Sequence, residues 1–362
     1  MKILTKENSL ILRGLAIISI MMHNFLHIGR WGFSEENEMS FTQAKVDAFW
    51  NAIQSGQTNF LGEVFSFLGW VGVPVFIFLT GYGIAIQGVE RDSNKVLSLE
   101  KRWFRLFLLM FPAVLLFATI DFISNGLSIN LLKRGLYLTQ LANFFYPYVV
   151  CQPGVYWYFG LTFQLYLIWT LIGSQLKGLK LLFLSMITLS GLYFINRYGP
   201  HVVNSIYRHC FTGWFEVFAF GILMAQKNCL REKFTWHWSV EIVFFLLLSG
   251  MVILLNSRME TWLFVPFFSL LAYISLGSLC LRVDFLASVL KWFGNISAYI
   301  FVCHPIARPL AIRFTPAEGG LALIVTIYVI LTIILSIAYR RVYENVYSFA
   351  ERHLFKNYVT ES

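Results

Sequence analysis

Long apolar runs recur along the whole chain, separated by short polar segments. Each run approaches the 20 or so residues that an α-helix needs to cross the hydrocarbon core of a bilayer. The runs do not alternate with a period of two, which is the pattern of strands in a membrane β-barrel. We therefore predict an all-α polytopic membrane protein of about ten transmembrane helices, at residues 10–29, 66–87, 103–124, 155–175, 178–196, 211–226, 237–256, 261–281, 292–314 and 319–340.

Composition and charge distribution agree with this pattern. Hydrophobic residues make up 57% of the 362 residues and charged residues 13%, against about 25% charged in soluble proteins. The net charge of +9 reflects topology rather than a nucleic-acid partner, which we do not expect. With the N-terminus inside, the inner segments hold 17 Lys and Arg and the outer segments 9. Since cytoplasmic loops collect these residues, we expect both termini in the cytoplasm, one transmembrane domain over residues 1–345, and a short cytoplasmic tail over 346–362.

Three histidines fall inside the predicted spans, where ionisable groups are costly and point to function. His23 and His27 are four residues apart in the first span and share a helical face. His304 precedes Pro305 in the ninth span, and this proline should free a backbone carbonyl near the imidazole. A histidine that only hydrogen-bonds a neighbouring helix is the alternative for His23 and His27. Zinc at this pair would need more ligands, and no HExxH motif occurs, so we expect no metal.

Arginines mark the inner ends of two spans. Arg13 lies in the first span, and Arg102 and Arg105 lie three residues apart at the start of the third. Two guanidinium groups on one face suit bidentate phosphate binding; the alternative is topology signalling with binding of anionic lipid. His23 lies about 15 Å along the helix from Arg13 and about 80° around its axis, whereas Asn24 lies about 20° from Arg13.

Five stretches carry a resemblance to a known family. In order they are LRGLAIISIMMH, FIFLTGYGI, KRWFRLFLLMFP, VYWYFGLTFQLYL and GNISAYIFVCHPI. They resemble the opening Arg-Gly-Leu-Ala helix with its His, the Phe-x-x-Ser-Gly-Phe stretch, the Arg-x-x-Arg before a proline, the Trp-Tyr helix and the late Ser-to-His segment of the acyltransferase-3 membrane proteins. Thr80 stands for the usual Ser, and nine residues rather than the usual ten separate Arg13 from His23. The resemblance covers nearly the whole chain.

The resemblance implies an acyltransferase of the bacterial inner (cytoplasmic) membrane. Family members pass acyl groups, usually acetyl, to cell-envelope glycans and related acceptors. We therefore expect O-acyl transfer from acetyl-CoA or another acyl-CoA, bound at the cytoplasmic side, to a hydroxyl of a glycan or lipid-linked sugar. The resemblance also implies an essential Arg and His in the first helix. It leaves the acceptor, the acyl group and the oligomeric state open.

Roles for individual residues follow from this chemistry. An imidazole suits the base that deprotonates a hydroxyl, so we assign His23, supported or replaced by His27, and expect His304 to orient substrate or stabilise negative charge. Four more residues are expected to contact substrate or support the site: Asn24, Trp157, Gln164 and Glu216. The donor phosphates are assigned to Arg13, Arg102 and Arg105. A transporter or flippase of lipid-linked glycans is the competing class, but it does not need the inner arginines together with the membrane histidines.

Overall fold

The computed structural model describes residues 4–27, 31–56, 59–90, 95–125, 131–146, 154–226, 237–316 and 320–354. Within these ranges every regular element is a helix, so the predicted all-α class is confirmed. The longer helices are α1 (Lys6–Leu26), α4 (Val73–Glu90), α5 (Lys95–Asn125), α7 (Trp157–Ile172), α8 (Leu179–Tyr198), α10 (Phe215–Gln226), α11 (Trp238–Asn256), α13 (Val265–Cys280), α14 (Asp284–Asn295), α15 (Ser297–Phe314) and α16 (Leu321–Leu354). The shorter elements are α2 (Gln43–Ser55), α3 (Phe60–Leu68), α6 (Leu131–Leu138), α9 (His201–His209) and α12 (Met259–Trp262), with 3₁₀ turns that include η1 (Gly69–Gly72) and η6 (Phe211–Gly213).

Each predicted apolar run overlaps at least one apolar helix within the described ranges. Seven helical stretches in the described ranges are long and apolar enough to cross a membrane, at Lys6–Leu26, Phe60–Gln87, Ser98–Thr119, Gly154–Ile172, Leu179–Tyr198, Trp238–Asn256 and Leu321–His353. The pair α14–α15, bent by 75°, can form an eighth, and α10 and α13 are apolar but shorter. The chain is thus a multi-pass membrane protein, while the count of ten crossings and the cytoplasmic termini stay predictions.

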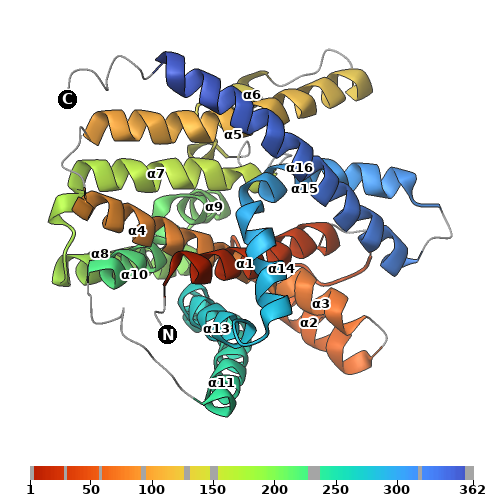
Figure 1. Ribbon diagram of the computed structural model, residues 1–362. Helices are drawn as coiled ribbons and strands as arrows, with labels where there is room; N and C mark the ends of the chain where they lie inside the picture. The colour runs from red at the N-terminus through yellow and green to blue at the C-terminus, as the bar shows by residue number, and fades with distance from the viewer. Residues whose placement is uncertain are drawn as a thin grey trace.

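Helix α1 lies in the middle of the bundle, beside η1, α3, α13, α14 and α15 (Figure 1). Glycines let its neighbours approach closely. A Cβ atom on Gly14 of α1 would collide with the carbonyl of Leu290 on α14, and one on Gly294 of α14 would collide with the carbonyl of Leu10. Helix–helix contact through small residues is the usual way in which membrane helices pack, because lipid supplies no hydrophobic drive between them.

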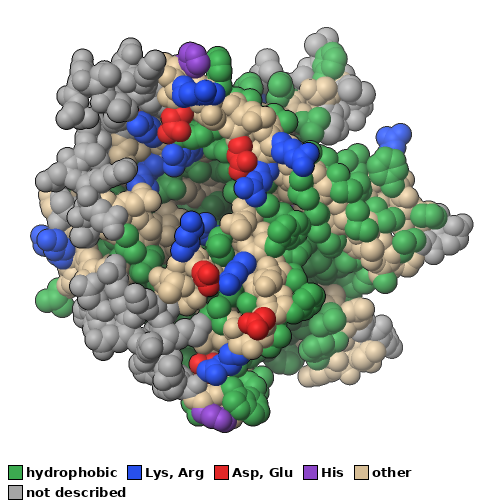
Figure 2. Space-filling view, viewed as in Figure 1, with side chains coloured by type: hydrophobic (Ala, Val, Ile, Leu, Met, Phe, Trp, Pro, Cys, Tyr) green, Lys and Arg blue, Asp and Glu red, His purple; other side chains and the backbone are tan. Residues whose placement is uncertain are grey.

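The start of α1 and the end of α16 lie on the same side of the molecule (Figure 1). Charged side chains gather on that side in the view of Figure 2, and hydrophobic side chains dominate the opposite side. Helix α16 continues to Leu354, so the first part of the segment predicted as a tail is helical. Residues 355–362 lie outside the described ranges.

Candidate functional site

A cavity of about 300 Å³ lies between α1, α4, α5, α7 and α15. Five helices that are far apart in the sequence therefore build one site. The apolar part of its wall includes Ile20 on α1 and Phe301 on α15. Its polar lining includes Arg13, Thr80, Gln87, Arg102, Tyr158 and Tyr166. The tyrosines were missed as site residues, although the fourth family-like stretch contains both, eight residues apart and hence on similar sides of one helix.

Two of the three predicted donor-binding arginines meet in this cavity. The guanidinium carbon of Arg102 lies 5.0 Å from the ring centroid of Tyr166, and its Nη2 donates to Gln87 Oε1 at 2.7 Å. Arg13 interacts electrostatically with the same Tyr166 and with Tyr158. Neither arginine forms an ion pair with a carboxylate of the described residues. The end of the cavity lined by these arginines therefore presents two positive charges that are available to an anion.

Arg105 lies one turn along α5 and faces a different element. Its Nε donates to the Tyr347 hydroxyl at 2.6 Å, and its Nη2 lies 3.8 Å from Glu351 Oε1. Both partners belong to α16. Arg105 is not among the residues that line the cavity, although it also lies close enough to Tyr166 to interact with it electrostatically.

The deep histidines lie one helical turn beyond the other end of the cavity. Ile20 and Phe301 line this end, and His23 and His304 follow them by three residues in α1 and α15. The two imidazoles are close enough to interact electrostatically. The spacing from Ser297, which also lines the cavity, to His304 is seven residues, so His304 continues the cavity-lining face of α15.

The surroundings of His304 fix its protonated nitrogen. Nδ1 lies 3.1 Å from the carbonyl oxygen of Ile300, and the imidazole also contacts the carbonyl of Phe301. Pro305 has no N–H to offer the latter carbonyl. Because a carbonyl only accepts, Nδ1 carries the proton and Nε2 presents a lone pair. Nε2 is buried and has no hydrogen-bond partner within the described residues.

His23 is held by the α3–η1 segment. Its Nδ1 lies 2.9 Å from the carbonyl oxygen of Ser66 and 3.2 Å from that of Phe65, which again leaves the lone pair on Nε2. Helix α1 is α-helical throughout Lys6–Leu26, so no bulge turns His23 toward the face of Arg13. Asn24 continues that face and donates from Nδ2 to the carbonyl oxygen of Ile20 at 2.9 Å.

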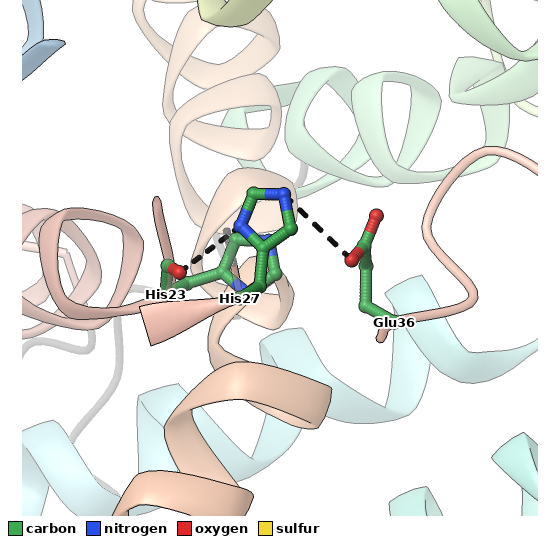
Figure 3. A group of neighbouring side chains, drawn as sticks. All are labelled: His23, His27 and Glu36. Carbon is green, nitrogen blue, oxygen red and sulfur yellow. Dashed lines mark hydrogen bonds and ion pairs between the residues drawn. The ribbon is translucent and has the colours of Figure 1, made fainter. Parts of the chain in front are cut away.

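His27 lies beside His23 at the end of α1. The rings are stacked, with centroids 4.5 Å apart and an angle of 7° between their planes. Nδ1 of His27 lies 3.1 Å from the carbonyl oxygen of His23, and Nε2 lies 4.0 Å from Glu36 Oε2. Figure 3 shows Glu36 reaching toward His27 from the segment after α1. Glu36 was not predicted as a site residue, because nothing in its spacing along the chain relates it to the histidines.

Comparison with known families decides the class of the protein. The sequence profile of the acyltransferase-3 family, described as an acyltransferase domain, matches residues 10–341. The chain belongs to the acyltransferase-3 family. The predicted family is thereby confirmed, and the protein is a membrane acyltransferase. No curated protein and no solved structure matches it.

The remaining predicted residues of this acyltransferase form a second cluster, away from the cavity lining. Trp157 stacks on Trp214 with centroids 5.8 Å apart. Gln164 Oε1 accepts from the backbone N–H of Phe211 at 3.0 Å. Glu216 is buried at the start of α10, and neither carboxylate oxygen has a hydrogen-bond partner within the described residues. Trp157, Gln164 and Glu216 are thus not among the residues that line the cavity.

Arg208 forms the centre of this second cluster, and sequence reasoning did not single it out. Its side chain is fully buried, and its guanidinium carbon lies 3.9 Å from the Trp214 ring and 4.9 Å from the Trp262 ring. Nε donates to the carbonyl oxygen of Glu38 at 2.9 Å and Nη1 to that of Gly213 at 2.6 Å. Burial lowers the pKa of Arg208 to about 10, so it stays charged at neutral pH. The contacts fix the segment that carries Glu36 against η6.

Proposed function

We propose that this acyltransferase moves an acyl group, with acetyl as the first candidate, from a cytoplasmic acyl-CoA to a hydroxyl of a cell-envelope glycan or lipid-linked sugar. We place it in the bacterial cytoplasmic membrane, with the acceptor reached from the outer side. One observation carries the proposal: the cavity has Arg13 and Arg102 at one end, and His23 and His304 lie one turn beyond the other.

The arginine end suits the phosphates of a CoA donor. A guanidinium group binds phosphate oxygens bidentately, and contact with Gln87 and Tyr166 restricts the orientation of Arg102. At about 300 Å³, the cavity is at the small end of ligand pockets. We therefore assign it to the acyl-bearing arm of the donor, with the nucleotide portion at the cytoplasmic mouth.

The histidine end suits transfer to a hydroxyl. Nε2 of His23 takes the hydroxyl proton while the hydroxyl oxygen attacks the thioester carbonyl carbon. The carbon–sulfur bond then breaks, and the CoA thiolate leaves and receives the proton. The carbonyls of Phe65 and Ser66 keep His23 in the tautomer that a base requires. His304, whose Nε2 also presents a lone pair, accepts a hydrogen bond that orients the acceptor.

Acetyl-CoA binding by the purified protein tests this proposal, with Arg102→Ala as the probe and Arg105→Ala as the matched control on the same helix. Hydrogen bonds to charged groups contribute about 1.5–3 kcal/mol. Arg102→Ala is therefore expected to raise the Kd about 10–100-fold, and Arg105→Ala, whose partners are Tyr347 and Glu351, less than about 3-fold.

Two results contradict the proposal in different ways. Equal effects of the two substitutions would remove the cavity as the donor site and leave the enzyme class intact. If wild-type protein bound neither acetyl-CoA nor any longer acyl-CoA, the donor assignment would be wrong, and transport of lipid-linked glycans would become the better hypothesis.

A further inference from the structure

We propose that His23, His27 and Glu36 form a binding site for a divalent transition-metal ion, with Zn²⁺ as the best-suited ion, at the outer end of α1. The three side chains each offer one ligand atom, and these atoms lie within 4.8 Å of one another. Figure 3 shows the two stacked imidazoles and the facing carboxylate. From the sequence we expected no metal, because a histidine pair alone has too few ligands; the fold supplies the third.

Hydrogen bonding leaves only acceptors at the centre of this group. Nδ1 of His23 faces the carbonyls of Phe65 and Ser66, and Nδ1 of His27 faces the carbonyl of His23. Nε2 of each imidazole is therefore the nitrogen left to bind a cation, and Nε2 of His27 lies 4.0 Å from Glu36 Oε2. Three converging acceptors without a donor repel one another and attract a cation. Carbonyl partners at Nδ1 are also the usual outer-shell contacts that orient metal-binding imidazoles.

The ligand set selects the class of ion. Two imidazole nitrogens and one carboxylate oxygen suit Zn²⁺ and related ions rather than Mg²⁺ or Ca²⁺, which prefer oxygen. Three protein ligands leave a fourth tetrahedral position for water or a substrate oxygen. Because a metal lies in the plane of each bound imidazole, coordination requires His27 to turn out of its stack with His23. The side chain of His27 is 24% exposed and that of Glu36 16%, which leaves a route for the ion.

The segment that carries Glu36 is fixed on both sides. Lys45 on α2 donates to the backbone carbonyl of Glu36 at 2.8 Å, and Arg208 donates to that of Glu38 at 2.9 Å. The backbone that carries the Glu36 carboxylate is therefore held by contacts with α2 and α9. Holding this backbone in place lowers the ordering cost for the Glu36 ligand, whereas His27 has to turn.

The consequence for activity rests on the proposed function, in which His23 is the base. A metal ion at His23 Nε2 occupies the lone pair that the base needs. We therefore infer that Zn²⁺ inhibits acyl transfer through this site and that chelation restores it.

Zn²⁺ titration of the tag-free, chelator-treated protein by calorimetry tests the site directly. We expect one ion per chain. Loss of a residue that only contacts a metal ligand already costs about 10–100-fold in metal affinity. Glu36→Gln and His27→Gln each remove a direct ligand, so each should weaken Zn²⁺ binding at least about 10-fold. The matched control is Glu35→Gln, the neighbouring carboxylate, which lies 3.5 Å from Lys45 and should bind as the wild type does.

The possible outcomes separate the site from the proposed function. Absence of stoichiometric binding, or equal binding by the Glu36→Gln and Glu35→Gln variants, overturns the site. Should Glu36→Gln fail to fold, His27→Gln decides in its place, and the Co²⁺ absorption spectrum of wild-type protein reports whether the geometry is tetrahedral. Metal binding that leaves acyl transfer unaffected supports the site and contradicts the role of His23 as the base.

Discussion

The position of His23 depends on a glycine in the neighbouring segment, and Gly69→Ala tests that dependence. Gly69 has φ −65°, a backbone angle that any residue adopts. A larger side chain is therefore limited only by steric contact with neighbouring atoms. A Cβ atom there would lie 2.5 Å from Cβ of His23 and 3.0 Å from the carbonyl oxygen of Ser19. Ordinary contact begins near 3.4 Å, so α1 and η1 must separate by about 1 Å.

This displacement acts on the hydrogen bonds that hold the imidazole. His23 Nδ1 now lies 2.9 Å from the Ser66 carbonyl oxygen, and an added 1 Å would break that bond. Misplacement of a reacting group by about 1 Å costs on the order of 100-fold in rate, and overpacking costs about 1–3 kcal/mol in stability. We expect Gly69→Ala to lower acyl transfer about 100-fold and to leave the Kd for acyl-CoA within about 3-fold, since Gly69 does not line the cavity.

The assay measures transfer of labelled acetyl from acetyl-CoA to acceptor in membranes, together with thermal unfolding of the purified protein. Gly250→Ala in α11 is the control, because a Cβ there meets nothing within 4 Å; it should retain activity and gain up to about 1 kcal/mol of stability. A folded Gly69→Ala protein with wild-type transfer would refute the argument that the placement of His23 governs the reaction.

Two further predictions concern the second cluster. Arg208→Met removes two charge-assisted hydrogen bonds and the contact with Trp214. We expect it to lower the free energy of unfolding by about 3 kcal/mol, measured by thermal denaturation against wild type. Burial lowers the pKa of His209 from 6.5 to about 4, so the unfolded chain binds the extra proton between these values. The contribution of His209 to the free energy of unfolding is therefore complete above pH 6.5. It falls as the pH decreases, by about 1 kcal/mol at pH 5.5. Unfolding temperatures of wild type and His209→Gln that fell in parallel over this range would contradict that assignment.

Sequence alone was sufficient for the fold class and the family. Apolar runs of bilayer length determine helices because an unsatisfied backbone cannot lie in lipid. Residue spacing along α1 also determined that His23 would not share the face of Arg13, since a regular helix turns by a fixed angle per residue. Both inferences depend only on local geometry, which is why they hold in the folded protein.

The contacts between distant segments were decided only by the tertiary structure. Arg102 and Arg105 are equivalent in the sequence pattern, yet one lines the cavity with Arg13 and the other binds Tyr347 of α16. Glu36 lies 4.0 Å from His27, because the segment after α1 packs beside the end of that helix. Such contacts depend on how distant segments pack in three dimensions, which the spacing of residues along the chain does not determine.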